Sequence, residues 1–330
     1  MGVIQLDTKK YEKIIEESKN NIYSEFPRII EFQTSSYCNG NCIVCPYSSM
    51  DIKPVKMNDD TLKNLLKEIV SNKDKIERVI PYLNNEPSFD KRMINILRYL
   101  KNNQLLIELS TNMSMWTKEE LDIIIDEKLV DDFRISFFAD NRELYHIMMP
   151  GLNFDSNVER INYFLNKNKN IIDTEIVAIM LPHLNVKKIR DGLKELFNNP
   201  QIHLFGFLDR CGKVKGFKND LEINEDSKLI GCSLKRPFER CCIYADGNVV
   251  LCSQDWAKKV VIGNINDNSI SEIWNSERAI KIRKIVSGEI SCEKDFLCNS
   301  CKLAILEESS KKVLNFKGDR YMKNDDTKRI

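Results

Sequence analysis

Short β-branched segments alternate with amphipathic helical segments through the first two-thirds of the chain, and this order constrains the fold more than any other feature. We predict six strands, at residues 28–33, 76–83, 105–111, 131–139, 173–181 and 202–208. One helix-period segment lies in each gap between them, at residues 61–70, 91–100, 118–126, 157–165 and 186–197. This repeated order predicts a parallel sheet with helices outside it, either barrel-like or doubly wound.

The region after Gly216 has a different pattern and holds seven of the eleven cysteines. Its segment CCIYADGNVVLC, residues 241–252, predicts a β-hairpin with an Asp-Gly turn. Residues 269–286 have the pattern of a helix, and the charged tail from about Glu307 is expected to fray. We therefore expect a small cysteine-rich region after the strand–helix repeat.

The composition is that of an ordinary globular protein, with 42% apolar and 30% charged residues and a net charge of +1. No apolar run approaches the roughly 20 residues that a bilayer crossing needs, and residues 1–20 lack the apolar segment of a signal peptide. We therefore predict a cytoplasmic protein that has neither a membrane nor a nucleic acid as a partner. In that reducing compartment, eleven cysteines indicate metal ligands or redox groups rather than disulfides.

Three cysteines stand close together in CNGNCIVC, directly after the first predicted strand. They are Cys38, Cys42 and Cys45, and in β/α barrels the carboxyl ends of the strands carry the chemistry. Three thiolates can hold three irons of a [4Fe–4S] cube and leave the fourth iron open to a substrate or cofactor. A zinc site that takes its fourth ligand from elsewhere in the chain is the alternative.

CNGNCIVC resembles the C-x₃-C-x-Φ-C signature of the radical S-adenosylmethionine (SAM) superfamily. Val44 stands at the Φ position, where the family often has an aromatic residue and where an apolar side chain can contact the adenine. The resemblance implies a partial (β/α)6 TIM-type barrel, an α/β fold, in which SAM chelates the open iron. One electron then cleaves SAM to methionine and a 5′-deoxyadenosyl radical, which removes a hydrogen atom from an unactivated carbon. The protein supplies orientation and excludes water.

Further positions are similar to the SAM-contact motifs of this family. NNEP, residues 84–87, is similar to the GGEP-type motif that binds the SAM amino group, with asparagine in place of both glycines. The resemblance places SAM contacts near successive strand ends, at Asn84, Asn85, Glu86, Ser110, Asn112, Ser136 and Met180. Turn capping by Asn84 and Asn112, and a buried hydroxyl at Ser136, are the structural alternatives.

A second group of cysteines is spread over the C-terminal region. Cys232, Gly247 and Cys252 form a Cys–gap–G-x₄-C pattern. Cys298 and Cys301 form C-x₂-C, and four such cysteines can saturate a second [4Fe–4S] cluster. The segment resembles the SPASM and twitch domains of radical SAM enzymes, and the lack of a C-x₂-C-x₅-C arrangement favours one auxiliary cluster, the twitch-like form. A Cys₄ zinc knot is the alternative.

Four cysteines remain outside these groups: Cys211, Cys241, Cys242 and Cys292. A spare cysteine is usually a small buried apolar residue. The adjacent pair Cys241 and Cys242 opens the predicted hairpin, so one of the two side chains can face the barrel mouth. Because an S–H bond is weaker than an alkyl C–H bond, such a thiol can return a hydrogen atom to the other face of a carbon radical, which is epimerisation. Cys211, with Asp209 beside it, is the second candidate for this catalytic role.

We divide the chain into an N-terminal helical extension (1–26), a radical SAM partial barrel (27–216), a SPASM/twitch-like domain (217–306) and a charged tail (307–330). The preferred function, on its resemblance to radical SAM peptide epimerases, is epimerisation of residues in a ribosomally made peptide. The alternatives are a dehydrogenase or crosslinking maturase that uses the auxiliary cluster as electron acceptor, a carbohydrate or aminoglycoside epimerase, and a non-catalytic iron–sulfur protein. The expected partners are a peptide substrate and a reductant such as flavodoxin or ferredoxin.

Overall fold

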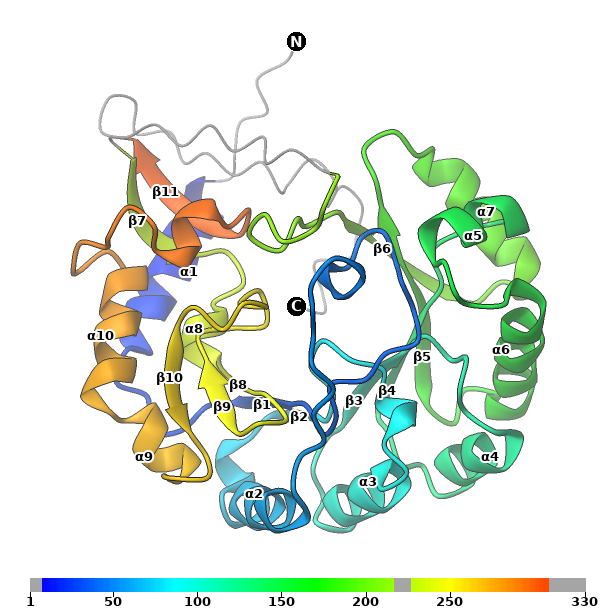
Figure 1. The fold of residues 1–330 in the computed structure, drawn as a ribbon, viewed down its shortest axis with the longest axis horizontal. Coiled ribbons are helices and arrows are strands. Elements are labelled where there is room, and N and C mark those ends of the chain that lie inside the picture. The colour runs from blue at the N-terminus through cyan, green and yellow to red at the C-terminus, as the bar shows by residue number, and fades with distance from the viewer. Residues whose placement is uncertain (1–7, 217–226, 309–330) are drawn as a thin grey trace.

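The six predicted parallel strands are present, and they form one curved row (Figure 1). The computed structural model describes residues 8–216 and 227–308, so our expectations for 1–7, 217–226 and 309–330 fall outside the described residues. The strands are β1 (Ile29–Phe32), β2 (Arg78–Ile80), β3 (Glu108–Thr111), β4 (Asp132–Ser136), β5 (Asp173–Met180) and β6 (Gln201–Gly206). β1 pairs with β2, and β3 to β6 pair in order, all in parallel. A bridge between Val79 and Ile107 joins the two sets.

Helices cover the outer side of this row (Figure 1). They are α2 (Asp59–Ser71), α3 (Met93–Asn102), α4 (Lys118–Asp126), α5 (Arg142–Met148), α6 (Phe154–Asn168) and α7 (Val186–Leu196). Short 3₁₀ turns lie at η1 (Pro46–Ser48), η2 (Lys73–Lys75) and η3 (Pro87–Phe89). The five predicted helices are confirmed to within a few residues. The sequence did not reveal α5, because this short helix buries only Tyr145 and Met148 and so lacks a clear apolar period.

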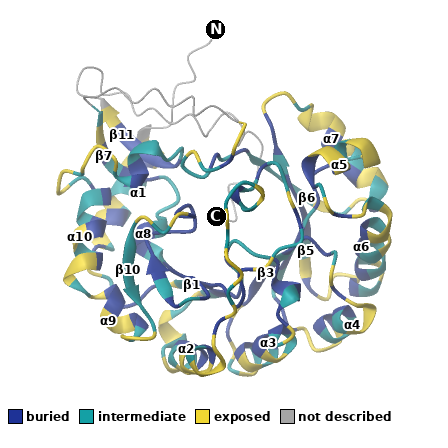
Figure 2. Ribbon diagram, in the orientation of Figure 1, coloured by how far each residue is buried: buried dark blue, intermediate teal, exposed yellow. Residues whose placement is uncertain are grey.

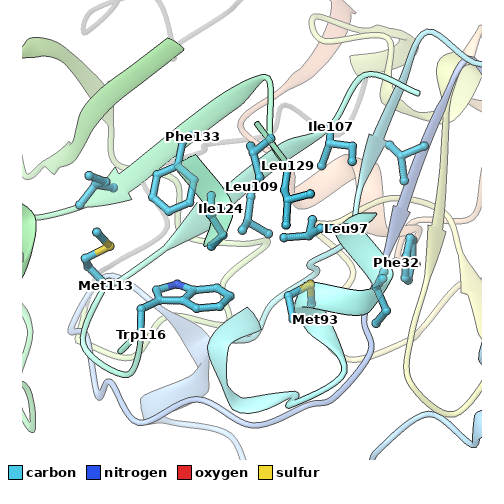
Figure 3. Packing of buried hydrophobic residues seen from close by; sticks show 14 of the residues in the cluster. Phe32, Met93, Leu97, Ile107, Leu109, Met113, Trp116, Ile124, Leu129 and Phe133 are labelled. Carbon is cyan, nitrogen blue, oxygen red and sulfur yellow. The ribbon is translucent and has the colours of Figure 1, made fainter. Parts of the chain in front are cut away.

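The apolar faces of helices and strands meet in one continuous core (Figure 3). α2 illustrates how the sequence specifies such a helix: the Asn58 side chain accepts a hydrogen bond from the Asp60 backbone N–H and caps the first turn. Its buried residues follow the helical period, at Leu62, Leu65, Leu66 and Ile69. On the strand side, Leu109 and Phe133 lie in the same core as Ile124 of α4. Burial therefore concentrates on the strands and the inner helix faces, while the outer helix faces are exposed (Figure 2).

The C-terminal region extends the same sheet beyond β1. β8 (Arg240–Ile243) pairs in parallel with β1, and β9 (Asn248–Val250) and β10 (Val261–Asn264) follow antiparallel. The predicted hairpin is confirmed as β8 and β9. Gly247 has φ +86 in its turn, a conformation that glycine adopts without strain. The sheet order is β10-β9-β8-β1-β2, so the two halves of the chain share one sheet.

The remaining C-terminal elements lie beside the N-terminal helix. β7 (Ser227–Cys232) pairs antiparallel with β11 (Ala304–Glu308), and Figure 1 places α1 (Thr8–Asn20) next to β7. The other elements are α8 (Arg236–Glu239), α9 (Ile270–Trp274), α10 (Glu277–Val286) and η4 (Leu297–Ser300). The single helix predicted over 269–286 is wrong, because Ser276 interrupts it and caps α10. The expected fraying from Glu307 is also wrong for that residue, which pairs with Lys228.

The row of strands does not close into a full barrel. Within the part of the chain that the structure describes, β6 pairs only with β5, while the other end of the row continues from β1 into β8. Helices lie on the outer side, so the fold is a partial TIM-type barrel rather than a doubly wound sheet (Figure 1). Because the strands of the barrel are parallel, the loops after them meet at one edge. No helix of the described segments is long and apolar enough to cross a bilayer.

Candidate active site

The loop after β1 carries the cysteine triplet at the carboxyl edge of the sheet. Cys38, Cys42 and Cys45 are all free thiols. The Cys45 N–H donates to the Cys42 carbonyl at 3.0 Å, which closes a tight turn within the loop. The Ile43 N–H donates to the carbonyl of Met148 at 3.1 Å. That second bond attaches the loop to α5, so the helix that the sequence did not reveal helps to position the triplet.

Burial and mutual proximity favour the protonated thiols in the metal-free protein. Burial raises the pKa of Cys38 to about 12, with the Glu86 carboxylate adding to the effect. Burial also raises the pKa of Cys42, and then Cys45 and Cys38 raise it further. Such thiols ionise when a metal supplies the compensating positive charge. In residues 8–216 and 227–308, no three Cys, His, Asp or Glu side chains are placed to hold a single metal ion. A cube places its thiolates on separate irons, and three neighbouring thiols on one loop fit that donor set.

Glu86 joins the ends of β2 and β3. This carboxylate is 2% exposed, and its Oε1 accepts a hydrogen bond from Thr111 Oγ1 at 2.6 Å. Its Oε2 accepts one from the Asn112 N–H at 2.7 Å, and Ser88 Oγ donates to Oε1 at 2.7 Å. Both carboxylate oxygens are therefore engaged within the protein. The structure places this predicted SAM contact at the strand ends, where it holds two of them in register.

The two asparagines before Glu86 have different environments. Asn84 has φ 56, a left-handed conformation that asparagine tolerates in place of glycine, and its Nδ2 donates to Tyr244 Oη at 2.8 Å. Asn85 Oδ1 accepts a hydrogen bond from the Leu83 N–H at 2.9 Å, whereas its buried Nδ2 has no partner. An unpaired buried amide group is costly, so a polar ligand at this site would satisfy it.

The other predicted SAM contacts follow the next strand ends. Ser110 Oγ and Ser136 Oγ lie 3.5 Å apart on neighbouring strands. Asn112 Nδ2 donates to Asn39 Oδ1 at 3.0 Å, which links the end of β3 to the triplet loop. Val44 and Met180 are each 2% exposed and belong to the main apolar core. The structure thus brings the polar residues to one edge, and their contacts with SAM stay a prediction.

Three separate segments bring the four C-terminal cysteines together. Cys232 ends β7, Cys252 follows β9, Cys298 lies in η4 and Cys301 follows it, and all four share one apolar cluster. Burial raises the pKa of Cys232, and it raises the pKa of Cys252 to about 12. The proximity of Cys301 raises both pKa values further. Burial also raises the pKa of Cys298, and all three of its companions contribute. Cys301 also shares a hydrogen bond with Cys211, and this bond raises the pKa of Cys301. The spacing of the cysteines in the sequence did not predict that contact.

Arg236 lies beside this second group and lowers the pKa of three of the thiols, Cys232, Cys252 and Cys301. The guanidinium donates from Nη1 to Ser253 Oγ at 2.9 Å, and its buried Nε has no partner. A half-buried cation whose buried N–H has no partner calls for an anionic neighbour. Four thiolates around an iron–sulfur cluster supply that charge, so these residues fit an auxiliary cluster.

The adjacent pair of spare cysteines faces two different environments. Cys242 stands opposite Glu31 in the pairing of β8 with β1, and its Sγ donates to Glu31 Oε2 at 3.5 Å. Cys241 stands opposite Ile30 and points to the other face, into the main core and towards Glu68 of α2. Successive residues of a strand alternate between faces, so only one of the pair faces inward. The inward residue is Cys242.

The remaining spare residues lie near the second cysteine group. Cys211 is half-buried beside Cys301, and Cys292 Sγ lies 3.5 Å from the Asn299 side chain. Asp209 is 1% exposed, and its Oδ2 has no hydrogen-bond partner. Burial raises the pKa of this carboxyl, and Lys302 opposes the shift. Cys211 and Asp209 therefore adjoin the second cysteine group, whereas Cys242 adjoins Glu31.

The inward face of the strands carries a charged network that we did not predict. Arg134 on β4 binds Glu108 at 3.0 Å and Glu175 at 3.1 Å. Arg78 binds Glu108 at 3.0 Å, and His203 Nδ1 lies 3.4 Å from Glu175 Oε2. Intervening strand residues face the helices in the main core. The signal in the sequence was a charged residue at alternate positions of otherwise apolar strands, which indicates a polar lumen.

Comparison with known protein families agrees with this geometry. The model of the radical SAM superfamily matches residues 32–196, half of the chain, and that of the SPASM iron–sulfur cluster-binding domain matches 232–302. One curated relative, the S-adenosyl-L-methionine-dependent 2-deoxy-scyllo-inosamine dehydrogenase of Niallia circulans, is 36% identical over 55 residues. That match spans 17% of this chain and 22% of the relative, about a fifth of its length.

Solved structures with the same fold extend over most of the chain. BtrN in complex with AdoMet and 2-DOIA has a TM-score of 0.54 at 16% identity, covering 88% of this chain and 97% of BtrN. SuiB of Streptococcus suis bound to precursor peptide SuiA has a TM-score of 0.61 at 14% identity, covering 89% and 74%. AdoMet-bound anSMEcpe has a TM-score of 0.60 at 17% identity, covering 87% and 93%. The chain belongs to the radical SAM superfamily and is a radical SAM enzyme with a SPASM domain, whose cofactors are SAM, a [4Fe–4S] cluster and auxiliary iron–sulfur.

Proposed function

We propose that this enzyme epimerises a carbon centre of a peptide substrate, with Cys242 as the hydrogen-atom donor. The contact between Cys242 Sγ and Glu31 Oε2, at 3.5 Å on the inward face of the sheet, is the observation that supports this most. Burial, and then the Glu31 carboxylate, raise the pKa of Cys242 well above its usual value. The sulfur therefore keeps its hydrogen at neutral pH, and a hydrogen-atom donor must do so.

Bound SAM and its cluster supply the radical that removes a hydrogen atom from the substrate. Cys242 then gives its hydrogen atom to the opposite face of the substrate radical. A C–H bond forms, the S–H bond breaks, and a sulfur radical remains on Cys242. One electron from an external reductant such as flavodoxin or ferredoxin converts that radical to a thiolate. The Glu31 carboxylate takes up a proton from solvent and passes it to the thiolate across the 3.5 Å contact, which restores the thiol and leaves Glu31 as a carboxylate again.

We assign the cofactor contacts to the residues at the strand ends. Cys38, Cys42 and Cys45 would hold the first cluster, and the four cysteines of the second group, Cys232, Cys252, Cys298 and Cys301, would hold the auxiliary one. Asn85 Nδ2, unpaired in this structure, is suited to a polar group of SAM. Ser110 and Ser136 offer hydroxyl groups to it, and Val44 and Met180 an apolar surface for the adenine. Glu86 and Asn112 act mainly by holding the strand ends, since their polar atoms already have partners inside the protein.

Two structural neighbours support a peptide as the substrate. SuiB is bound to precursor peptide SuiA, and anSMEcpe is bound to AdoMet and the Cp18Cys peptide. The likeness of this chain to both lies in the fold, at 14% and 17% identity. The charged groups of the inward network suit a substrate rich in hydrogen-bonding groups, and a peptide backbone meets that requirement.

Oxidation of the substrate is the second candidate, and the local match to a dehydrogenase favours it. In that reaction the substrate radical passes one electron to the auxiliary cluster and loses one proton to a base. Asp209 is suited to accept the proton, because its buried Oδ2 has no partner in the protein. The product would then have two hydrogen atoms fewer than the substrate. An aminoglycoside or carbohydrate epimerase would use Cys242 as proposed, on a different substrate.

The mass of the product formed in deuterated water tests the proposal. Epimerisation by Cys242 predicts one solvent deuteron at the altered carbon, because the thiol hydrogen exchanges with solvent. Peptides encoded beside the gene are the first substrates to assay, with chiral analysis of the hydrolysed product. A product two mass units lighter would reject epimerisation and select oxidation.

Cys242→Ser provides the second test, with Cys241→Ser as its matched control. The first variant should still cleave SAM but give no epimer, whereas Cys241→Ser should give epimer, since Cys241 faces the core. Cys211→Ser should also give epimer. Epimer from the Cys242 variant at the wild-type rate would exclude Cys242 as the donor.

A further inference from the structure

Two arginines lie between the two groups of cysteines, and Gln254 connects them. Arg210 follows β6, and Arg236 begins α8. With its amide turned so that the oxygen faces both guanidinium groups, Gln254 accepts hydrogen bonds from Arg210 Nη1 at 2.5 Å and from Arg236 Nη1 at 2.7 Å. Gln254 is 2% exposed, so this contact is inside the protein. The three side chains form a continuous hydrogen-bonded chain.

The ends of this chain lie beside different cysteine groups. Arg210 is close enough to Cys45 of the triplet to lower the pKa of that thiol. Arg236 donates to Ser253 Oγ at 2.9 Å, directly after Cys252 in the chain, and it lowers the pKa of Cys232, Cys252 and Cys301. The chain therefore spans the region between the two sites.

The charges in this region are unbalanced within the protein. In the residues that the structure describes, neither Arg210 nor Arg236 forms an ion pair with an Asp or Glu, and Arg236 Nε is buried without a partner. Burial lowers the pKa of Arg210, and the neighbouring Arg236 lowers it further, whereas Cys45, Cys211 and Glu31 oppose the shift by smaller amounts. Two half-buried like charges held side by side are costly unless anions accompany them. Iron–sulfur clusters ligated by thiolates carry negative charge and would compensate both guanidinium groups.

We infer that Arg236, held in place by Gln254, raises the reduction potential of the auxiliary cluster. The inference rests on the cluster assigned to the second cysteine group under the proposed function. Reduction adds one electron and hence one negative charge to the cluster, and a nearby cation inside the protein stabilises that charge. Gln254 keeps Arg236 in position because its amide oxygen accepts hydrogen bonds from both guanidinium groups and so holds the two like charges side by side.

Potentiometric titration of the holoenzyme, followed by electron paramagnetic resonance, tests this inference. Added SAM changes the signal of the SAM-binding cluster and so identifies the signal of the auxiliary one. The reference point is the potential at which half of the wild-type auxiliary cluster is reduced. At that potential, Arg236→Gln should lower the ratio of reduced to oxidised cluster about tenfold. This change is equivalent to a reduction potential about 59 mV lower for a one-electron couple. Arg236→Lys keeps the charge and should stay within about twofold of wild type. Lys281→Gln, an exposed position on α10, removes an equal charge that solvent screens and should change nothing.

Gln254→Glu keeps both arginines and gives a test that does not depend on Arg236→Gln assembling its clusters. The new carboxylate pairs with the guanidinium groups and cancels part of their charge, so the auxiliary cluster should again become harder to reduce. Wild-type potentials in both variants, as in Lys281→Gln, would overturn the inference. These potentials are measured without substrate, so a failure of epimerisation leaves the result intact, and an unchanged potential leaves the proposed function intact.

Discussion

The two groups of cysteines are assembled in different ways. Cys38, Cys42 and Cys45 lie on one loop after β1, whereas the second group joins the end of β7, the segment after β9, and η4. Closing a short loop costs little chain entropy, and joining distant segments costs more. The first site therefore depends on local sequence and one strand, while the second exists only once the whole C-terminal region has folded. A metal cluster at the second site should stabilise the fold far more than one at the first.

The largest expected effect comes from breaking the triplet. Cys45→Ala should abolish the formation of 5′-deoxyadenosine under reduction and lower the iron content from about eight to about four per chain. Because the triplet is local, the midpoint of thermal unfolding should move by less than about 2 °C. Iron analysis, product chromatography and calorimetry of the anaerobically reconstituted protein measure the three quantities. SAM cleavage by the variant would show that the triplet is not the SAM-binding site.

Breaking the second group should have the opposite pattern of effects, with a large loss of thermal stability and little change in SAM cleavage. Cys252→Ala should lose the auxiliary cluster and lower the midpoint of thermal unfolding by about 5 °C or more, because the cluster joins segments that are distant in the sequence. SAM cleavage in the absence of substrate should persist, since the triplet is untouched. A midpoint equal to that of Cys45→Ala would mean that the two sites contribute equally to stability, and would contradict the larger role expected of the second site.

Glu86→Gln tests how far the first site depends on the neighbouring strands. The carboxylate accepts hydrogen bonds from Thr111, Asn112 and Ser88, and an amide can accept at one atom only. We expect a loss of about 2 kcal/mol in the free energy of unfolding and weaker SAM binding. Urea unfolding and calorimetric titration with SAM measure the two effects. Wild-type stability in this variant would mean that the buried contacts contribute nothing.

The smallest expected effect concerns the contact between the two halves of the chain at Asn84. Asn84→Ala loses the bond to Tyr244 and places alanine at φ 56, so it should cost about 1–2 kcal/mol. Asn84→Gly loses the same bond without the backbone strain and should cost under about 1 kcal/mol. Urea unfolding of both variants separates the two contributions. If the two variants are equally stable, the left-handed backbone at this position carries no strain.

Much of the fold was predictable because strand and helix periods are local properties of the chain. The six strands and five of the helices of the barrel are confirmed, as is the hairpin around Gly247. The misses are short or interrupted elements: α5 buries too few residues to show a period, and Ser276 divides the helix predicted over 269–286. Among the strands, β7 and β11 are a pair from opposite ends of the C-terminal region, and their partnership could not be read from either segment alone.

The sequence by itself determined the triplet and the family to which the chain belongs, because eight consecutive residues, 38–45, carry that information. It also determined the strand before the triplet, because the period of residues 28–33 is local. Only the tertiary structure decided that Cys242 faces Glu31 while Cys241 faces the core, since the direction of each side chain depends on how β8 registers with β1. It also decided that Arg210, Gln254 and Arg236 meet between the two sites. Such contacts join segments far apart in the chain, and no local pattern encodes which of them will come together.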